Sequence, residues 1–141
     1  MLQDLSDFLR SMLNFRGINW WTLLSGIGLN FIITTFASLG GTYLATNEAT
    51  AEVYTRFGPL LMVIVLFAVY VLAGFIVAKI ADDVPTKHSF LSSLGAVFPL
   101  IFAGVIGFNP FLIMLALIAV AGNLNGGMLA IPRSRRMPPQ S

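Results

Sequence analysis

Four long apolar runs constrain this chain more than any other feature of its sequence. Each run can cross a hydrocarbon core about 30 Å thick, which takes roughly 20 helical residues. None of the runs carries a charge in its central part. Backbone groups in a membrane must be satisfied internally, and the runs lack the alternation of barrel strands, so they predict helices. The predicted spans are residues 20–45, 57–80, 90–108 and 110–131.

Composition supports this class of protein and excludes several others. Hydrophobic residues make up 57% of the chain and charged residues 10%, against about 45–50% and about 25% in soluble domains. This balance excludes a water-soluble enzyme and a disordered chain. The absence of cysteine from the sequence excludes a disulfide scaffold and a Cys-based zinc site. We therefore expect an all-α, polytopic membrane protein in which residues 1–141 form a single membrane domain.

Two prolines within the predicted spans lead to local expectations. Pro59 is expected in the first turn of the second span, where its missing backbone N–H costs nothing. Pro99 lies mid-way along the third span and is expected to kink it. The carbonyl that it frees needs a donor from Ser92, Ser93, a neighbouring helix or an ordered water.

The first 17 residues predict a short amphipathic helix at the membrane surface. The two acids Asp4 and Asp7 precede the first arginine, which is not the charge order of a signal peptide. They balance Arg10 and Arg16, whereas a helix that binds anionic lipid by itself is usually rich in Lys and Arg. Docking on lipid and docking on protein therefore both stay open. The apolar positions recur at spacings of three and four: Leu2, Leu5, Phe8, Leu9, Met12 and Leu13.

Basic residues predict the orientation of the four spans. The opposite side of the membrane would hold only Arg56. Because Lys and Arg near span ends are retained in the cytoplasm, we expect both termini, including a tail at 132–141, on the cytoplasmic side of the inner (plasma) membrane. Trp20 and Trp21 would anchor the first span at the cytoplasmic interface. Seven basic residues share that side: Arg10, Arg16, Lys79, Lys87, Arg133, Arg135 and Arg136.

A stripe of small and polar residues runs down one face of the first span. It comprises Gly26, Asn30, Thr34 and Ser38, and Gly41 extends the small surface toward the other end. Small residues at this spacing let helix backbones approach closely, and the amide and hydroxyl groups can bond across the gap. The alternative is the lining of a pore or substrate groove. We favour packing because no ionisable group lies on the stripe, and such groups usually mark transport paths.

Similar packing positions occur on the other spans. Gly122 and Gly126 form a GxxxG pattern on the last span, with Asn123 beside them. Gly74 and Ala78 repeat the four-residue spacing on the second span. Together these positions predict a compact bundle. We expect Asn123 to lie near the membrane interface, within reach of water or neighbouring carbonyls.

His88 is the only imidazole in the sequence. It could ligate a haem, a chlorin or a metal, or relay a proton beside a quinone. A metal site usually takes three or four ligands, however, and only Asp82 and Asp83 are near in sequence. We therefore expect a solvated histidine in a short cytoplasmic loop, with no metal and no cofactor.

No pattern typical of an enzyme occurs in the sequence. It has no Gly-rich phosphate loop with a lysine, no Ser/His/Asp set at a suitable depth and no paired intramembrane carboxylates. We expect no catalytic residues. The few basic residues follow membrane topology, so we also expect no nucleic-acid partner.

The stretch GFIVAKIADD…KHSFLSSLGAV, followed by GNLNGGMLA in the last span, resembles the small four-helix bacterial membrane proteins of the YrzE-like type. That family usually has Gly after the histidine, where this chain has Ser89. It has no established activity, so the resemblance implies a four-helix bacterial membrane protein and little more. The matching positions are Gly74, Ala78, Lys79, His88, Gly126 and Gly127.

These features lead us to expect a non-catalytic accessory subunit of a larger membrane complex, such as a respiratory or photosynthetic electron-transfer complex. Its partners would be the lipid bilayer and other integral membrane subunits. One alternative is a small oligomeric transporter or channel, with a path between copies along the Asn30–Thr34–Ser38 face. A stand-alone membrane-organising protein is another. The sequence leaves open the partner, the oligomeric state and any pigment, haem or quinone shared with a partner.

Overall fold

The computed structural model describes residues 1–132, which form only helices and the turns between them. Four of the segments are long and apolar enough to cross a membrane. The prediction of an all-α chain with four such helices is confirmed. The predicted tail at 132–141, with its three arginines, lies outside the described residues from position 133 onward. The helices are α1 (Leu2–Leu13), α2 (Trp20–Thr46), α3 (Ala51–Ile80), α4 (Pro85–Ser92), α5 (Leu94–Ile106) and α6 (Pro110–Ala130).

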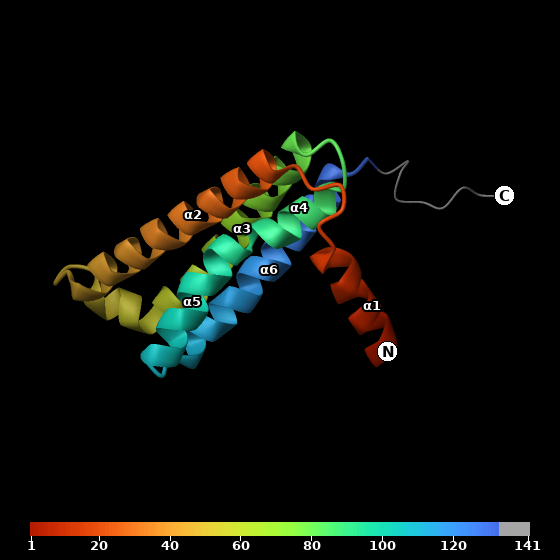
Figure 1. The fold of residues 1–141 in the computed structure, drawn as a ribbon. Coiled ribbons are helices and arrows are strands. Elements are labelled where there is room, and N and C mark those ends of the chain that lie inside the picture. Colours follow the sequence, from red (N-terminus) through yellow and green to blue (C-terminus); the bar gives the residue numbers. More distant parts are fainter. Residues whose placement is uncertain (133–141) are drawn as a thin grey trace.

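Helices α2 to α6 form an up-and-down bundle (Figure 1). We call one end of the bundle the terminal end. It holds the starts of α2 and α4 and the ends of α3 and α6. At the other, the hairpin end, lie the α2–α3 and α5–α6 turns. Helix α2 packs against α3 and α5, and α6 also packs against α3 and α5, so α2 and α6 are diagonal. The α3–α6 contact is the most extensive in the bundle.

The third span is made of two helices that have different neighbours. Helix α4, at the terminal end, packs against α2, α3 and α6. The backbone of helix α5, toward the hairpin end, lies close to α2 and α6 but not to α3. The two helices meet at Ser93, where the hydroxyl donates to the Phe90 carbonyl at 2.6 Å. Such local side-chain bonds compete with the helical ladder, which accounts for a break at this position.

The expectation for Pro59 differs from the structure. Helix α3 begins at Ala51, so Pro59 lies inside the helix and not in its first turn. The apolar run marks only the part of α3 suited to hydrocarbon, and the more polar residues 51–56 extend the helix beyond it. Pro99 lies inside helix α5, so the kink expected there stays a prediction. Helix α4 gives way to α5 at Ser93, whose backbone keeps right-handed helical angles (φ −61°, ψ −19°).

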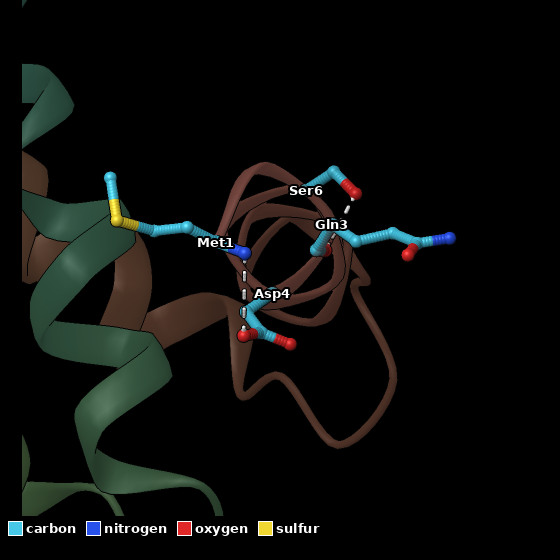
Figure 2. A network of polar contacts seen from close by, with 4 residues as sticks. All are labelled: Met1, Gln3, Asp4 and Ser6. Atoms are coloured by element: carbon cyan, nitrogen blue, oxygen red, sulfur yellow. Dashed lines mark hydrogen bonds and ion pairs between the residues drawn. The ribbon is translucent and has the colours of Figure 1, made fainter.

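Helix α1 stands apart from the bundle. It runs across the long direction of the bundle at the terminal end (Figure 1), and α4 is the only helix that it contacts. None of its residues is buried. Figure 2 shows that its first polar contacts stay within the helix: the Ser6 hydroxyl donates to the Gln3 carbonyl at 2.8 Å, and the N-terminal ammonium lies 3.9 Å from the Asp4 carboxylate.

Candidate functional site: a polar cluster and a cavity inside the bundle

Two asparagines meet in the middle of the bundle, on the diagonal helices α2 and α6. Asn30 and Asn123 are both fully buried. The Asn123 amide donates to the Asn30 side-chain oxygen at 2.8 Å, and the reciprocal bond from Asn30 measures 3.3 Å. The Ser92 hydroxyl of α4 lies 3.3 Å from the Asn30 amide nitrogen. Three helices that are distant in sequence are thus joined by hydrogen bonds at one point.

Small neighbours make room for this polar cluster. A Cβ atom at Gly26 would lie 2.7 Å from the Ser92 Cβ, closer than real Cβ atoms come. At Gly74 it would meet the backbone of Asn123 itself. The absence of side chains at these two positions therefore allows α2 to reach α4 and α3 to reach α6.

The predicted packing positions divide between the interior and the surface. Ser38 and the two anchor candidates Trp20 and Trp21 are exposed, and Trp21 retains 82% of its surface. The Trp20 ring stacks on Phe15, with 5.6 Å between the ring centroids. The other nine positions are buried: Gly26, Asn30, Thr34, Gly41, Gly74, Ala78, Gly122, Asn123 and Gly126.

Of the two alternatives expected for Asn123, water is wrong and a neighbouring carbonyl is confirmed. Asn123 lies fully buried at the centre of the polar cluster and also bonds the Ala119 carbonyl of its own helix at 2.9 Å. The cause is its close pairing with Asn30, which the spacing within either helix does not reveal. Asn125 remains exposed and bonds the Ala121 carbonyl at 2.7 Å.

A second polar pair lies beside the cluster. The Thr34 hydroxyl donates to the Asn30 carbonyl at 2.8 Å, and its oxygen lies 2.8 Å from the Tyr70 hydroxyl. Since Thr34 has one proton to donate, Tyr70 is the donor in the second bond. Tyr70 is fully buried and was not among the predicted packing residues. Its spacing of four residues before Gly74 was the available signal.

The predicted solvation of His88 is wrong, because the structure buries this side chain fully. Nε2 lies 2.9 Å from the Asn19 backbone nitrogen and accepts its hydrogen. The proton of the neutral ring is therefore on Nδ1, which lies 3.1 Å from the Val84 carbonyl and donates to it. The segment after Pro85 is the helix α4 and not a loop, so His88 turns inward with Ser89, Leu91 and Ser92.

His88 therefore connects α4 to the start of α2. Its partner Asn19 is the N-cap of α2, and the Asn19 side chain accepts from Trp21 N at 3.1 Å. On the next position, the Ser89 hydroxyl donates to the Gly74 carbonyl of α3 at 2.6 Å. These two adjacent residues bond α4 to α2 and to α3, respectively.

Every buried side-chain nitrogen or oxygen atom in the described part of the chain has a hydrogen-bond partner. Within residues 1–132, no three His, Cys, Asp or Glu side chains lie close enough together to hold a metal ion. The polar cluster itself is made of amides and hydroxyls, which can fix helices and donate or accept hydrogen bonds. Its arrangement suits helix association.

A cavity of about 440 Å³ lies in the half of the bundle toward the hairpin end. Side chains of α2, α3, α5 and α6 line it, including Leu66, Leu100 and Leu115 near mid-bundle and Tyr54 near the hairpin end. The Thr34–Tyr70 pair closes its deep end. The cavity lies where the backbones of α5 and α3 are farther apart than those of α4 and α3. Figure 1 shows the two hairpins diverging toward this end.

Comparison with known proteins does not place the chain in a family. No model of a protein family matches the chain, and no curated protein or solved structure does either. The resemblance to the YrzE-like membrane proteins therefore stays a prediction.

Proposed function

We propose that this chain is a non-catalytic subunit of a larger membrane protein complex and docks on it through α1. The observation that carries the proposal is the apolar face of α1, which the bundle does not cover. Leu5 and Leu13 each retain 54% of their surface. An apolar stripe on a helix needs an environment that removes it from water.

The polar face of α1 favours a protein partner over lipid alone. Asp4 pairs with the N-terminal ammonium, and Asp7 balances Arg10 on the same short helix. A surface helix that binds anionic lipid by itself usually carries several Lys and Arg residues on that face. A protein groove that receives the leucines requires no such excess.

The interior of the bundle supports the non-catalytic part of the proposal. The Asn30–Asn123–Ser92 cluster is bonded within itself and to neighbouring carbonyls. His88 has both ring nitrogens engaged with backbone groups. These residues stabilise the bundle and present no free nucleophile or base.

The proposal includes the setting of the protein. We place it in a bacterial inner membrane with both termini in the cytoplasm, supported by the concentration of basic residues at the terminal end. The class of complex that we propose is a respiratory or photosynthetic electron-transfer complex. The large subunits of such complexes hold the cofactors, so a small subunit can act through packing and lipid contacts alone.

The test is a mild-detergent purification from native membranes with a tag on the C-terminus. Mass spectrometry identifies the co-purifying chains, and the absorption spectrum of the eluate reports pigment or haem. We expect stoichiometric recovery of redox or pigment-binding subunits. Recovery of this chain alone, as a defined homo-oligomer without pigment, would contradict the proposal and favour a stand-alone membrane-organising protein.

A matched pair of variants tests the role of α1. Leu5→Glu places a charge on the apolar face, and Ser6→Glu places the same charge on the neighbouring exposed position. We expect Leu5→Glu to lose the partner subunits and Ser6→Glu to keep them. Equal retention by both variants would show that the apolar face of α1 is not the docking surface.

The cavity favours one alternative, a small transporter or channel. A path between copies along the Asn30–Thr34–Ser38 face is wrong, because Asn30 and Thr34 point into their own bundle. A path would instead pass through the cavity and the polar cluster beneath it. Flux through liposomes containing the purified chain, abolished by Thr34→Leu, would support this alternative.

A further inference from the structure

We infer that the cavity binds one hydrocarbon chain of a membrane lipid, whose head group lies at the hairpin end. The inference does not depend on the proposed subunit role, because it concerns a different surface and a different ligand. It rests on the length, the volume and the distribution of polar groups of the cavity.

The cavity has the length of one leaflet of hydrocarbon. Its wall on α2 extends from Thr34 to Ala45, which at 1.5 Å per residue is about 16 Å. Half of a hydrocarbon core about 30 Å thick has nearly the same depth. A chain inserted from the hairpin end would therefore reach the Thr34–Tyr70 pair without leaving its own leaflet.

The volume fits a single chain. At 440 Å³ the cavity is large enough for a lipid tail, since an apolar cavity of about 150 Å³ holds one benzene molecule. Spread over the length of the α2 wall, this volume makes a narrow channel with room for one chain and not for two side by side. Left empty, it would deprive its lining side chains of dispersion contacts.

Polar groups are arranged for an amphiphile that enters tail first. At the deep end, Thr34 and Tyr70 bond each other, and Thr34 also bonds the Asn30 carbonyl. Toward the hairpin end, Thr42 and Tyr54 line the cavity, and neither hydroxyl makes a hydrogen bond within residues 1–132. Ser38 lies one turn from Thr34, in the deep half. The hydroxyls of Thr42 and Tyr54 therefore lie on the side where a head group would be, and the Thr34–Tyr70 pair at the deep end is already hydrogen-bonded.

A lateral crevice gives such a chain access from the bilayer. It lies between α2 and α5, has a volume of about 290 Å³, and shares Ser38 and Ala103 with the wall of the cavity. Its rim includes Phe31 and Leu39, which are exposed on the outside of the bundle. A lipid tail can move through it without its head group leaving the membrane surface.

The first experiment uses phosphatidylcholine vesicles that contain a trace of phosphatidylcholine spin-labelled near the end of one chain. We expect the reconstituted protein to give a motionally restricted component for one bound chain. The variant Ala37→Leu/Ala103→Leu fills the cavity with its own side chains and should lose this component. The control Gly40→Leu adds the same side chain to α2 where nothing lies within 4 Å, and it should retain the component. An unchanged component in the filled variant would overturn the inference.

A second experiment tests for water in the cavity and needs only a small substitution. The sequence has no cysteine, so Ser38→Cys introduces the only thiol. We expect a water-soluble maleimide to label it slowly in the same vesicles, and much faster after the lipid is stripped with detergent. The exposed position Glu48→Cys serves as the control for fast labelling. Equally fast labelling of both thiols in vesicles would show a water-filled vestibule and contradict the inference.

Discussion

A close approach of α6 to α3 predicts the effect of adding one methyl group at Gly126. A Cβ atom there would meet the Val71 carbonyl oxygen and lie 2.6 Å from the Phe75 backbone nitrogen, whereas real Cβ atoms essentially never come within 3.0 Å. Both are backbone atoms of α3, so no side-chain rotation can relieve the clash. Helix α3 must move away from α6, which also loosens the contact between Gly74 and the backbone of Asn123.

The expected free-energy change follows from two opposing effects. Overpacking costs about 1–3 kcal/mol, and we take the upper end because backbone atoms must move. Replacing a helical glycine with alanine returns about 1 kcal/mol. We therefore expect Gly126→Ala to lose about 2 kcal/mol of stability, since the clash outweighs the gain in helix propensity.

The matched control is Gly40→Ala on α2, where the added methyl meets nothing within 4 Å. It keeps only the propensity gain of about 1 kcal/mol, so it should be as stable as the parent or more stable. The assay is unfolding in mixed micelles with increasing SDS, followed by far-UV circular dichroism. Equal stability of the two alanine variants would refute the close α3–α6 contact.

Three further predictions concern the polar contacts and the topology. A double-mutant cycle with Asn30→Leu and Asn123→Leu should give a coupling free energy of about 1 kcal/mol, because two interhelical hydrogen bonds are worth roughly 0.6 kcal/mol each. Additive effects of the two substitutions in the SDS assay would mean that the two amides do not bond. His88→Ala removes the acceptor of the Asn19 N–H and should cost about 1–3 kcal/mol. Amide exchange should then become faster in the first turn of α2, whereas the exposed control Asp83→Ala should leave it unchanged. In intact cells, an impermeant maleimide should label Glu48→Cys at the hairpin end, and it should label Asp83→Cys only after permeabilisation. The reverse pattern would mean that the termini lie outside the cytoplasm.

The long elements could be predicted from the sequence because each apolar run has the length of a membrane span. The small and polar stripe on the first span also stands out, since Asn30 is costly in hydrocarbon unless it has a partner. Its partner on α6, by contrast, follows only from the three-dimensional arrangement.

Tyr70 illustrates why other residues could not be found. The run around it is apolar on every side, so hydrophobic periodicity does not indicate which face of α3 turns inward. For His88, the sequence does contain a signal of burial. Pro85 suits the first position of a helix, and a helix starting there places His88 on a buried face. The cavity is lined by four helices that are distant in sequence, and no local pattern encodes how they face one another.

The break at Ser93 gives the two leaflet halves of the molecule different mechanical properties. At the terminal end, α4 ties α2, α3 and α6 together, and a change in separation there would break several buried hydrogen bonds. At the hairpin end, the backbone of α5 does not approach α3, and the α2–α3 and α5–α6 pairs are joined there by apolar packing without buried interhelical hydrogen bonds like those of the polar cluster. Membranes differ in thickness by a few ångströms, and proteins adapt by tilting their helices. The half of this bundle that is held by apolar packing alone is therefore the half where such an adjustment would break no buried hydrogen bond.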